Sequence, residues 1–220
     1  MLVGAPAYAE ISRLAQLKKA DLLVLPTHGR TGWKRVFLGS TAERLVQHSV
    51  CPVLVARRDK SRPAGAELAF RKIVVPVDFS ERALAGLKYA LWFGKKFGAK
   101  ITVLHVIAPV ATGDAATTYE ISKYMEATRA DAEALMKVFI RRATRGPFPG
   151  GTAIVTGFVS GRVCTFAKDE CADLIITATH GRTGLSHALI GSTAESMVRH
   201  ASCPVLVVPS QLTRRSARKA

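Results

Sequence analysis

Several signals that would place a protein in a special class are absent from this sequence. No apolar run approaches the roughly 20 residues of a membrane span. The first residues lack the basic region and long apolar stretch of a secretion signal. The four cysteines form no Cys-x-x-Cys pair, so the usual zinc spacing is missing. We therefore expect a cytoplasmic protein whose thiols are reduced and mostly structural.

Acidic residues are also scarce: 16 Asp and Glu face 32 Lys and Arg, which gives a net charge of +16. The basic excess is spread along the 220 residues rather than gathered into one patch. Aromatic residues make up 7% and do not cluster as base stacking requires. We therefore expect no specific nucleic-acid site, and weak charge-driven binding stays open as an alternative.

The sequence contains an internal repeat that is marked by two motifs. THGRTG occurs at 27–32 and again at 179–184, and GSTAE follows at 39–43 and 191–195. Residues 20–56 align without gaps to 172–208, and 21 of those 37 positions are identical. One supersecondary unit is therefore used twice.

The second copy of the unit has a full set of preceding segments. Ser80 suits a helix N-cap, and Gly98 ends the apolar stripe that follows it. The near-continuous apolar runs predict strands that are buried on both faces, and helical patterns separate them. This alternation predicts an open parallel α/β sheet. The expected strands are 72–80, 100–109, 152–157, 173–179 and 203–209, and the later helices are 119–143, 160–171 and 192–200.

The first copy lacks most of those preceding segments, because residues 1–4 match only the end of the third strand. We divide the chain into a partial unit (1–57), a polar linker (58–70), a complete domain (71–209) and a basic tail (210–220). The partial unit alone would expose an apolar strand edge, so we expect it to pack against the complete domain or against a second chain. A start further upstream is a third interpretation.

The second THGRTG loop has the features of a phosphate cradle. Gly181 and Gly184 let backbone N–H groups approach a ligand. Gly191 and Ser192 then open a helix whose N-terminus suits an anion. Ligands of open α/β sheets bind at the carboxyl ends of strands, where this loop begins. A loop that serves packing alone is the structural alternative.

The whole pattern resembles the universal stress protein family. The resemblance rests on the Ala-Asp-Leu strand, His-Gly followed after nine residues by Gly-Ser, the Cys-Pro-Val-Leu-Val strand, PVDFS at 76–80 and LHV at 104–106. It covers 71–209 as a whole domain and 1–57 as the C-terminal part of one. It implies a tandem protein with an incomplete first domain. It also implies a Rossmann-like, five-stranded parallel sheet in the order 3-2-1-4-5.

The same resemblance implies an ATP site in the complete domain. One group of residues would hold the adenine, and the others would hold the ribose and the phosphates. Carried over position by position, the adenine group is Pro76, Val77, Asp78 and Val106, and the second group is Ala178, Gly181, Gly191, Ser192 and Thr193. Arg182 is a further candidate for the phosphates, with a solvated loop arginine as the alternative.

Two departures from the family pattern bear on that site. The motif's first glycine is Ala178 in the complete copy, which fits only if its φ is negative and nothing crowds its Cβ. It is Pro26 in the partial copy, where proline also removes an N–H donor. The partial copy further lacks the first and second strands of the domain, whose ends would form the side of the site that holds the adenine. We therefore predict one nucleotide site in 71–209 and none in 1–57, where Gly29, Gly39 and Ser40 would be remnants without a ligand.

The remaining expectations concern chemistry and assembly. No nucleophile–base pair or metal cluster is evident, so turnover is not indicated, and slow ATP hydrolysis stays open. Glu195 has the spacing of a capping box with Ser192. The family resemblance implies antiparallel pairing of Val53–Ala56 with Val205–Val208 and self-association into a homodimer, with no membrane partner. The function predicted is a stress-response ATP-binding module; a scaffold without nucleotide, or a weak basic nucleic-acid binder, are the alternatives.

Overall fold

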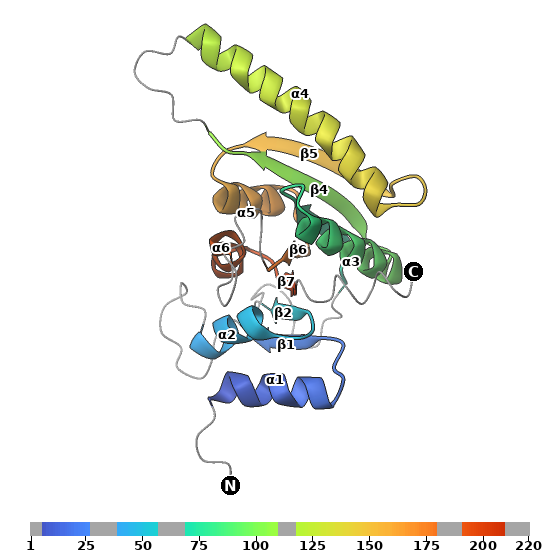
Figure 1. Ribbon diagram of the computed structural model, residues 1–220, viewed down its shortest axis with the longest axis vertical. Coiled ribbons are helices and arrows are strands. Elements are labelled where there is room, and N and C mark those ends of the chain that lie inside the picture. Colours follow the sequence, from blue (N-terminus) through green and yellow to red (C-terminus); the bar gives the residue numbers. More distant parts are fainter. Residues whose placement is uncertain (1–5, 27–38, 57–68, 110–117, 180–190, 210–220) are drawn as a thin grey trace.

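A single seven-stranded sheet runs through the part of the protein that the computed structural model describes, namely residues 6–26, 39–56, 69–109, 118–179 and 191–209 (Figure 1). The strands lie in the order β1-β2-β7-β6-β3-β4-β5. They are β1 (Leu23–Pro26), β2 (Val53–Ala56), β3 (Lys72–Pro76), β4 (Lys100–Ile107), β5 (Gly150–Thr156), β6 (Leu174–Ala178) and β7 (Val205–Val208). The helices are α1 (Ala7–Leu17), α2 (Ser40–His48), α3 (Glu81–Phe97), α4 (Thr118–Ala143), α5 (Val159–Asp169) and α6 (Ser192–His200).

The five strands of the complete domain confirm the predicted order. The sequence β5-β4-β3-β6-β7 is the third, second, first, fourth and fifth strand of that domain, and every neighbouring pair in it is parallel. The expectation of a five-stranded parallel sheet was nevertheless incomplete. The sheet continues past β7 into β2 and β1, and the β2–β7 pair is antiparallel, so the whole sheet is mixed.

The antiparallel pair joins the two copies of the repeated unit. Val53, Leu54 and Val55 lie opposite Val207, Leu206 and Val205, as the sequence predicted for these strands. Within the chain, the last strand of the partial copy therefore pairs with the last strand of the complete one. Arg199 of α6 reinforces this junction, because it contacts Glu195 at 2.5 Å and Glu43 of α2 at 3.9 Å.

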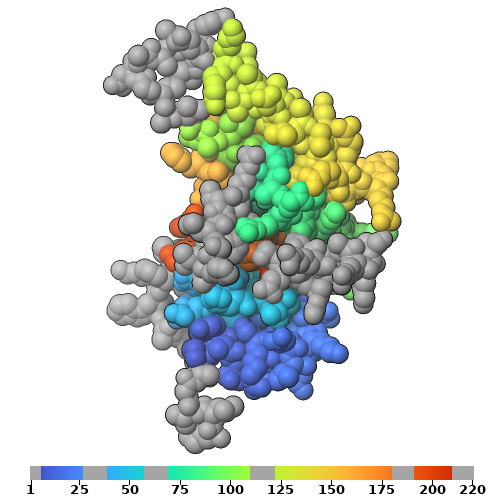
Figure 2. Space-filling model, viewed as in Figure 1, coloured from blue at the N-terminus to red at the C-terminus, as the bar shows by residue number. Residues whose placement is uncertain are grey.

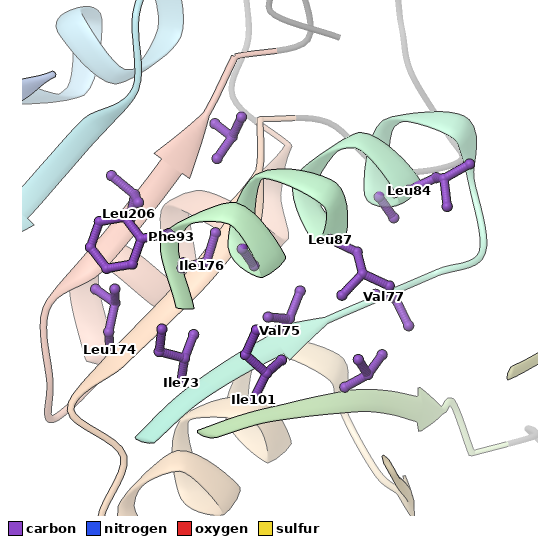
Figure 3. Close-up of a cluster of buried hydrophobic side chains, with 14 of the residues drawn as sticks. Ile73, Val75, Val77, Leu84, Leu87, Phe93, Ile101, Leu174, Ile176 and Leu206 are labelled. Carbon is purple, nitrogen blue, oxygen red and sulfur yellow. The ribbon is translucent and has the colours of Figure 1, made fainter. Parts of the chain in front are cut away.

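Two apolar layers cover the two faces of the sheet. On one face, α3 and α4 pack over the strands, and Figure 3 shows Leu84, Leu87 and Phe93 of α3 pointing toward side chains of β3, β6 and β7. On the other face, α5 and α6 cover the strands of the complete domain, and α2 covers β2. The central strands β2, β3, β6 and β7 are buried on both faces, which explains why they appear in the sequence as unbroken apolar runs.

The helix after β3 is set by its two ends. The Ser80 hydroxyl accepts a hydrogen bond from the Ala83 N–H at 3.2 Å, and Gly98 adopts a left-handed φ of 66° that ends the helix. Both assignments were predicted. The strand before this helix is shorter than the predicted 72–80, because β3 ends at Pro76 and the chain turns before Ser80.

The end of the expected linker belongs to the core. Residues 57–68 lie outside the described part of the chain, but Phe70 is buried. Its ring contacts Phe93 at 5.4 Å and Phe97 at 5.7 Å between centroids, both in edge-to-face arrangements. The core of the complete domain therefore takes in an aromatic residue from the linker segment.

Leu206 should be one of the most costly positions to truncate, because it is fully buried and lies opposite Leu54 across the junction. We predict that Leu206→Ala lowers the free energy of unfolding by about 2–5 kcal/mol. Urea unfolding followed by circular dichroism would measure this. Leu135→Ala is the matched control, since Leu135 on α4 is 47% exposed; an equal loss in both variants would contradict the assignment.

Stability should also fall at alkaline pH because of Cys203. Burial raises the pKa of this thiol from 9.0 to about 11. The unfolded chain ionises first, so the stabilisation is complete below pH 9 and is lost as the pH rises toward 11. Urea unfolding at pH 8 and pH 10.5 should show a smaller alkaline loss in Cys203→Ala than in the unmodified chain. Equal losses would exclude this thiol as a contributor.

Candidate functional site

The predicted site lies where the chain reverses its path through the sheet. From β3 the chain proceeds outward to β4 and β5, and it then returns to place β6 on the other side of β3. β3 and β6 are parallel neighbours, with Ile73 opposite Leu174 and Val74 opposite Ile175. Their carboxyl ends therefore open at the same edge, which is the switch point where open α/β sheets bind ligands.

Three predicted residues follow one another at the end of β3. Pro76 is the last residue of the strand, and Val77 donates its N–H to the Leu104 carbonyl at 2.8 Å. The Val77 carbonyl accepts a hydrogen bond from His105 Nδ1 at 2.8 Å. Asp78 is partly buried, and its Oδ1 accepts the Ser80 N–H at 3.0 Å. This turn fixes the Asp78 carboxylate at the carboxyl edge of the sheet.

Phe79 forces the sharp turn between Asp78 and Ser80. Its φ is 63°, a left-handed value that is costly for a residue with a Cβ. Its ring stacks on His105 at 4.3 Å between centroids and meets Phe139 edge-to-face at 5.6 Å. These contacts oppose the backbone cost. The sequence analysis missed Phe79, although an aromatic residue just after an apolar strand and just before an N-cap was the available signal.

The start of α6 lies against the end of β6. Gly191 donates its N–H to the Thr179 carbonyl at 2.9 Å, and Thr179 donates to the Val208 carbonyl at 3.1 Å. Gly191 is the N-cap of α6 and has no side chain that could satisfy the helix start. Within the described residues, no side chain caps the first N–H groups of the helix, which begin at Ser192 and Thr193 and are of the kind that bind an anion. The first intrahelical bond to Gly191 is made by Glu195, at 3.1 Å.

The capping box predicted for this helix is wrong. Ser192 lies inside the helix rather than at the N-cap, and Glu195 forms an ion pair with Arg199 at 2.5 Å instead of turning back to the helix start. The (i, i+4) spacing of Glu195 and Arg199 favours this pair. The Glu195 side chain therefore turns along the helix and leaves its N-terminus open.

Ala178 satisfies both conditions set for it by the sequence. It is not among the described residues with positive φ, since it continues the extended backbone of β6. Its methyl group faces α3 at Gly86, where a Cβ added to the glycine would lie 3.7 Å from the Ala178 Cβ. Gly86 thus leaves room for this methyl in the layer between α3 and β6. An alanine in place of the family's glycine causes no strain here.

Val106 and Val77 contact different faces of the sheet. Val106 belongs to the apolar cluster on the α5 and α6 side, whereas Val77 belongs to the cluster under α3 and α4. A ligand at the start of α6 would therefore meet the Val106 side of the sheet, and Val77 would offer its backbone rather than its side chain. The sequence alone did not separate these two contributions.

The rest of the predicted loop falls outside the described part of the chain. Gly181 and Arg182 lie in 180–190, outside the described residues, as does Gly29 of the partial copy. Gly39 and Ser40 do open α2, and Gly39 has nearly the backbone angles of Gly191. Among the described residues, however, β1 has no neighbour that corresponds to β3. The described chain also contains no group of three His, Cys, Asp or Glu side chains that could hold a metal ion.

A family model of universal stress proteins matches residues 1–57 and 69–209. The chain belongs to the universal stress protein family. Its sequence is similar to universal stress protein MJ0531 of Methanocaldococcus jannaschii, with 31% identity over 64% of this chain and 84% of that protein. Universal stress protein MJ0577 of the same organism is 28% identical over 63% of this chain and 94% of that protein.

Solved structures show the same fold. Universal stress protein UspA of Lactobacillus plantarum is 27% identical, with a TM-score of 0.57 over 64% of this chain and 99% of that one. The functionally unknown protein PA1789 of Pseudomonas aeruginosa is 20% identical, with a TM-score of 0.69 over 99% of this chain and 74% of that one. The second likeness concerns the fold only, and it extends to the partial copy. Within the described residues, no helix is long and apolar enough to cross a membrane.

The turn at Phe79 can be tested with a pair of substitutions. Phe79→Ala removes the ring contacts and keeps a Cβ at positive φ, whereas Phe79→Gly removes both. We therefore expect the glycine variant to be more stable than the alanine variant by about 1 kcal/mol. Urea unfolding of the two proteins would measure the difference. An alanine variant as stable as the glycine variant would show that the backbone is not strained at this position.

Proposed function

We propose that residues 71–209 of this universal stress protein bind one adenine nucleotide, ATP, at the carboxyl edge of β3 and β6. The hydrogen bond between Gly191 and Thr179 carries the proposal, because it holds the N-terminus of α6 at that edge. The carboxylate turn after β3 opens beside it. The chain would act as a binding module of the stress response in the cytoplasm rather than as an enzyme.

The phosphates would bind at the start of α6. The N–H groups of the first helical turn and the positive end of the helix dipole attract an anion. Ser192 and Thr193 add hydroxyl donors at the same place, and Ser192 is exposed. Gly181 and Arg182 of the preceding loop would add their backbone and guanidinium donors. The Glu195 carboxylate is neutralised by Arg199 rather than turned toward this end.

The adenine would lie at the end of β3 and β4. Val106 offers apolar surface on the α6 side of the sheet, and the Val77–Asp78 backbone offers polar groups at its edge. Asp78 is held by the Ser80 N–H, so its carboxylate is positioned before a ligand arrives. A pre-positioned acceptor lowers the cost of ordering the site on binding.

The partial copy would not bind nucleotide. Gly39 and Ser40 start α2 as Gly191 and Ser192 start α6. The turn that carries Asp78 has no counterpart beside β1 in the described chain. Half of the contacts are therefore missing. We propose that this copy is an incomplete first domain of a tandem protein and that its role is to complete the sheet through β2.

Isothermal titration with ATP would test the site and its number. We expect one ATP per chain. Ser192→Ala should weaken binding about tenfold through the loss of a hydroxyl bond to a charged phosphate. Ser40→Ala is the matched control, because Ser40 occupies the equivalent position in the partial copy and should leave the affinity unchanged.

Other outcomes would point to the alternatives. Two ATP molecules per chain would refute the single site. No heat of binding, together with no gain in melting temperature at saturating ATP, would favour a scaffold that holds no nucleotide. A mobility shift with nucleic acid that disappears by about 0.2 M salt would indicate only nonspecific attraction to the +16 chain.

A further inference from the structure

His105 lies beneath the turn that carries Asp78. It belongs to β4, and its ring is stacked on Phe79 with 4.3 Å between the ring centroids. Phe79 in turn meets Phe139 of α4 edge-to-face at 5.6 Å. Successive side chains of a strand point to opposite faces, and the neighbouring Val106 belongs to the cluster on the α5 and α6 side. His105 is therefore on the α3 and α4 side of the sheet.

This placement separates the His105 ring from a ligand at the start of α6. Figure 2 shows α3 and α4 side by side, and together they cover the face on which His105 lies. Helix α6 and the side chain of Val106 pack on the opposite face. Any effect of His105 on binding must therefore pass through the backbone at the end of β3.

The imidazole holds the residue that precedes Asp78. The ladder between β3 and β4 ends with Pro76 opposite Leu104. Just beyond it, the Val77 N–H donates to the Leu104 carbonyl at 2.8 Å, and the Val77 carbonyl accepts from His105 Nδ1, also at 2.8 Å. Both backbone groups of Val77 are thus bound to β4, one of them by a side chain. The histidine therefore fixes the chain at the point where the backbone ladder stops.

The same ring supports the residue that follows Asp78. Phe79 has a left-handed φ of 63°, which is costly for a residue with a Cβ. Stacking of the Phe79 ring on His105 opposes that cost. The next N–H, that of Ser80, then reaches Asp78 Oδ1 at 3.0 Å. One side chain therefore restrains the backbone on both sides of Asp78.

We propose that His105 is a positioning residue for the nucleotide site. Its ring acts from the face of the sheet turned away from the ligand, and it fixes the turn around Asp78 before the ligand arrives. A turn that is already ordered lowers the cost of binding. This role rests on the ATP site proposed for residues 71–209.

Two properties of the imidazole contribute to this role, and substitution separates them. His105→Ala removes both the ring that stacks on Phe79 and the donor to the Val77 carbonyl. His105→Phe restores a flat ring without the donor. His105→Asn restores an N–H donor close to the position of Nδ1 without the ring. Each of the last two variants should therefore recover part of what the alanine variant loses.

Isothermal titration with ATP would measure these contributions. We expect His105→Ala to weaken binding about tenfold, and His105→Phe and His105→Asn to weaken it about threefold each. His200→Ala is the matched control, because it removes the same kind of bond, from His200 Nδ1 to the Ser196 carbonyl at 2.8 Å, at the far end of α6. It should leave the affinity unchanged.

Hydrogen exchange followed by mass spectrometry gives a readout that needs no nucleotide. The Val77 and Ser80 amides are both hydrogen-bonded in the turn, so His105→Ala should speed exchange in peptides that cover 77–80. Exchange in α6 should stay unchanged, because this helix packs on the other face of the sheet. A purely structural role of His105 would instead speed exchange across the whole core.

Several results would overturn the positioning role. One is an unmodified chain that binds ATP and three His105 variants that bind it equally well. Others are an equal loss of affinity in His200→Ala, or faster exchange throughout the core. If His105→Ala does not fold, the Phe and Asn variants still carry the comparison. An unmodified chain that binds no ATP would refute the proposed function itself, and the positioning role with it.

Discussion

The antiparallel pairing of β2 with β7 is the contact on which the rest of the molecule depends. It joins one and a half copies of a unit into a single sheet, and it buries Val53, Leu54 and Val55 of the partial copy. The apolar clusters on both faces cross this junction, so neither copy's core ends at its own boundary. The strand order of the complete domain does not depend on the β2–β7 pairing. The burial of the partial copy does depend on it.

The sequence predicted those parts of the fold that a periodic pattern specifies. Buried parallel strands, the Ser80 and Gly98 helix ends, the strand order and the β2–β7 pairing all followed from apolar runs, cap residues and the family resemblance. The remaining features depend on contacts between distant segments. The left-handed Phe79 rests on His105, and the burial of Phe70 depends on α3. Glu195 pairs with Arg199 because α6 begins at Ser192, one residue earlier than a capping box with Ser192 at the N-cap requires.

For the candidate site, the sequence predicted which residues come together better than it predicted how their side chains are oriented. The residues at the ends of β3 and β6 do meet at one edge of the sheet, because parallel neighbours end together. Which face each side chain occupies could not be read from the motif, and Val77 and Val106 prove to lie on opposite faces. The substitution at Ala178 is harmless for a reason outside the motif: Gly86, almost a hundred residues earlier, leaves room for the methyl group.

The same junction determines the order in which the protein can fold. Val55 finds its partner in Val205, about 150 residues further along the chain. During synthesis the N-terminal strands must therefore wait until β7, the final strand of the sheet, has left the ribosome. Such long-range pairing slows folding and leaves β1 and β2 open to wrong partners in the interval. The strands β1 and β2 precede β7 in the chain, yet they gain their place in the sheet only after it.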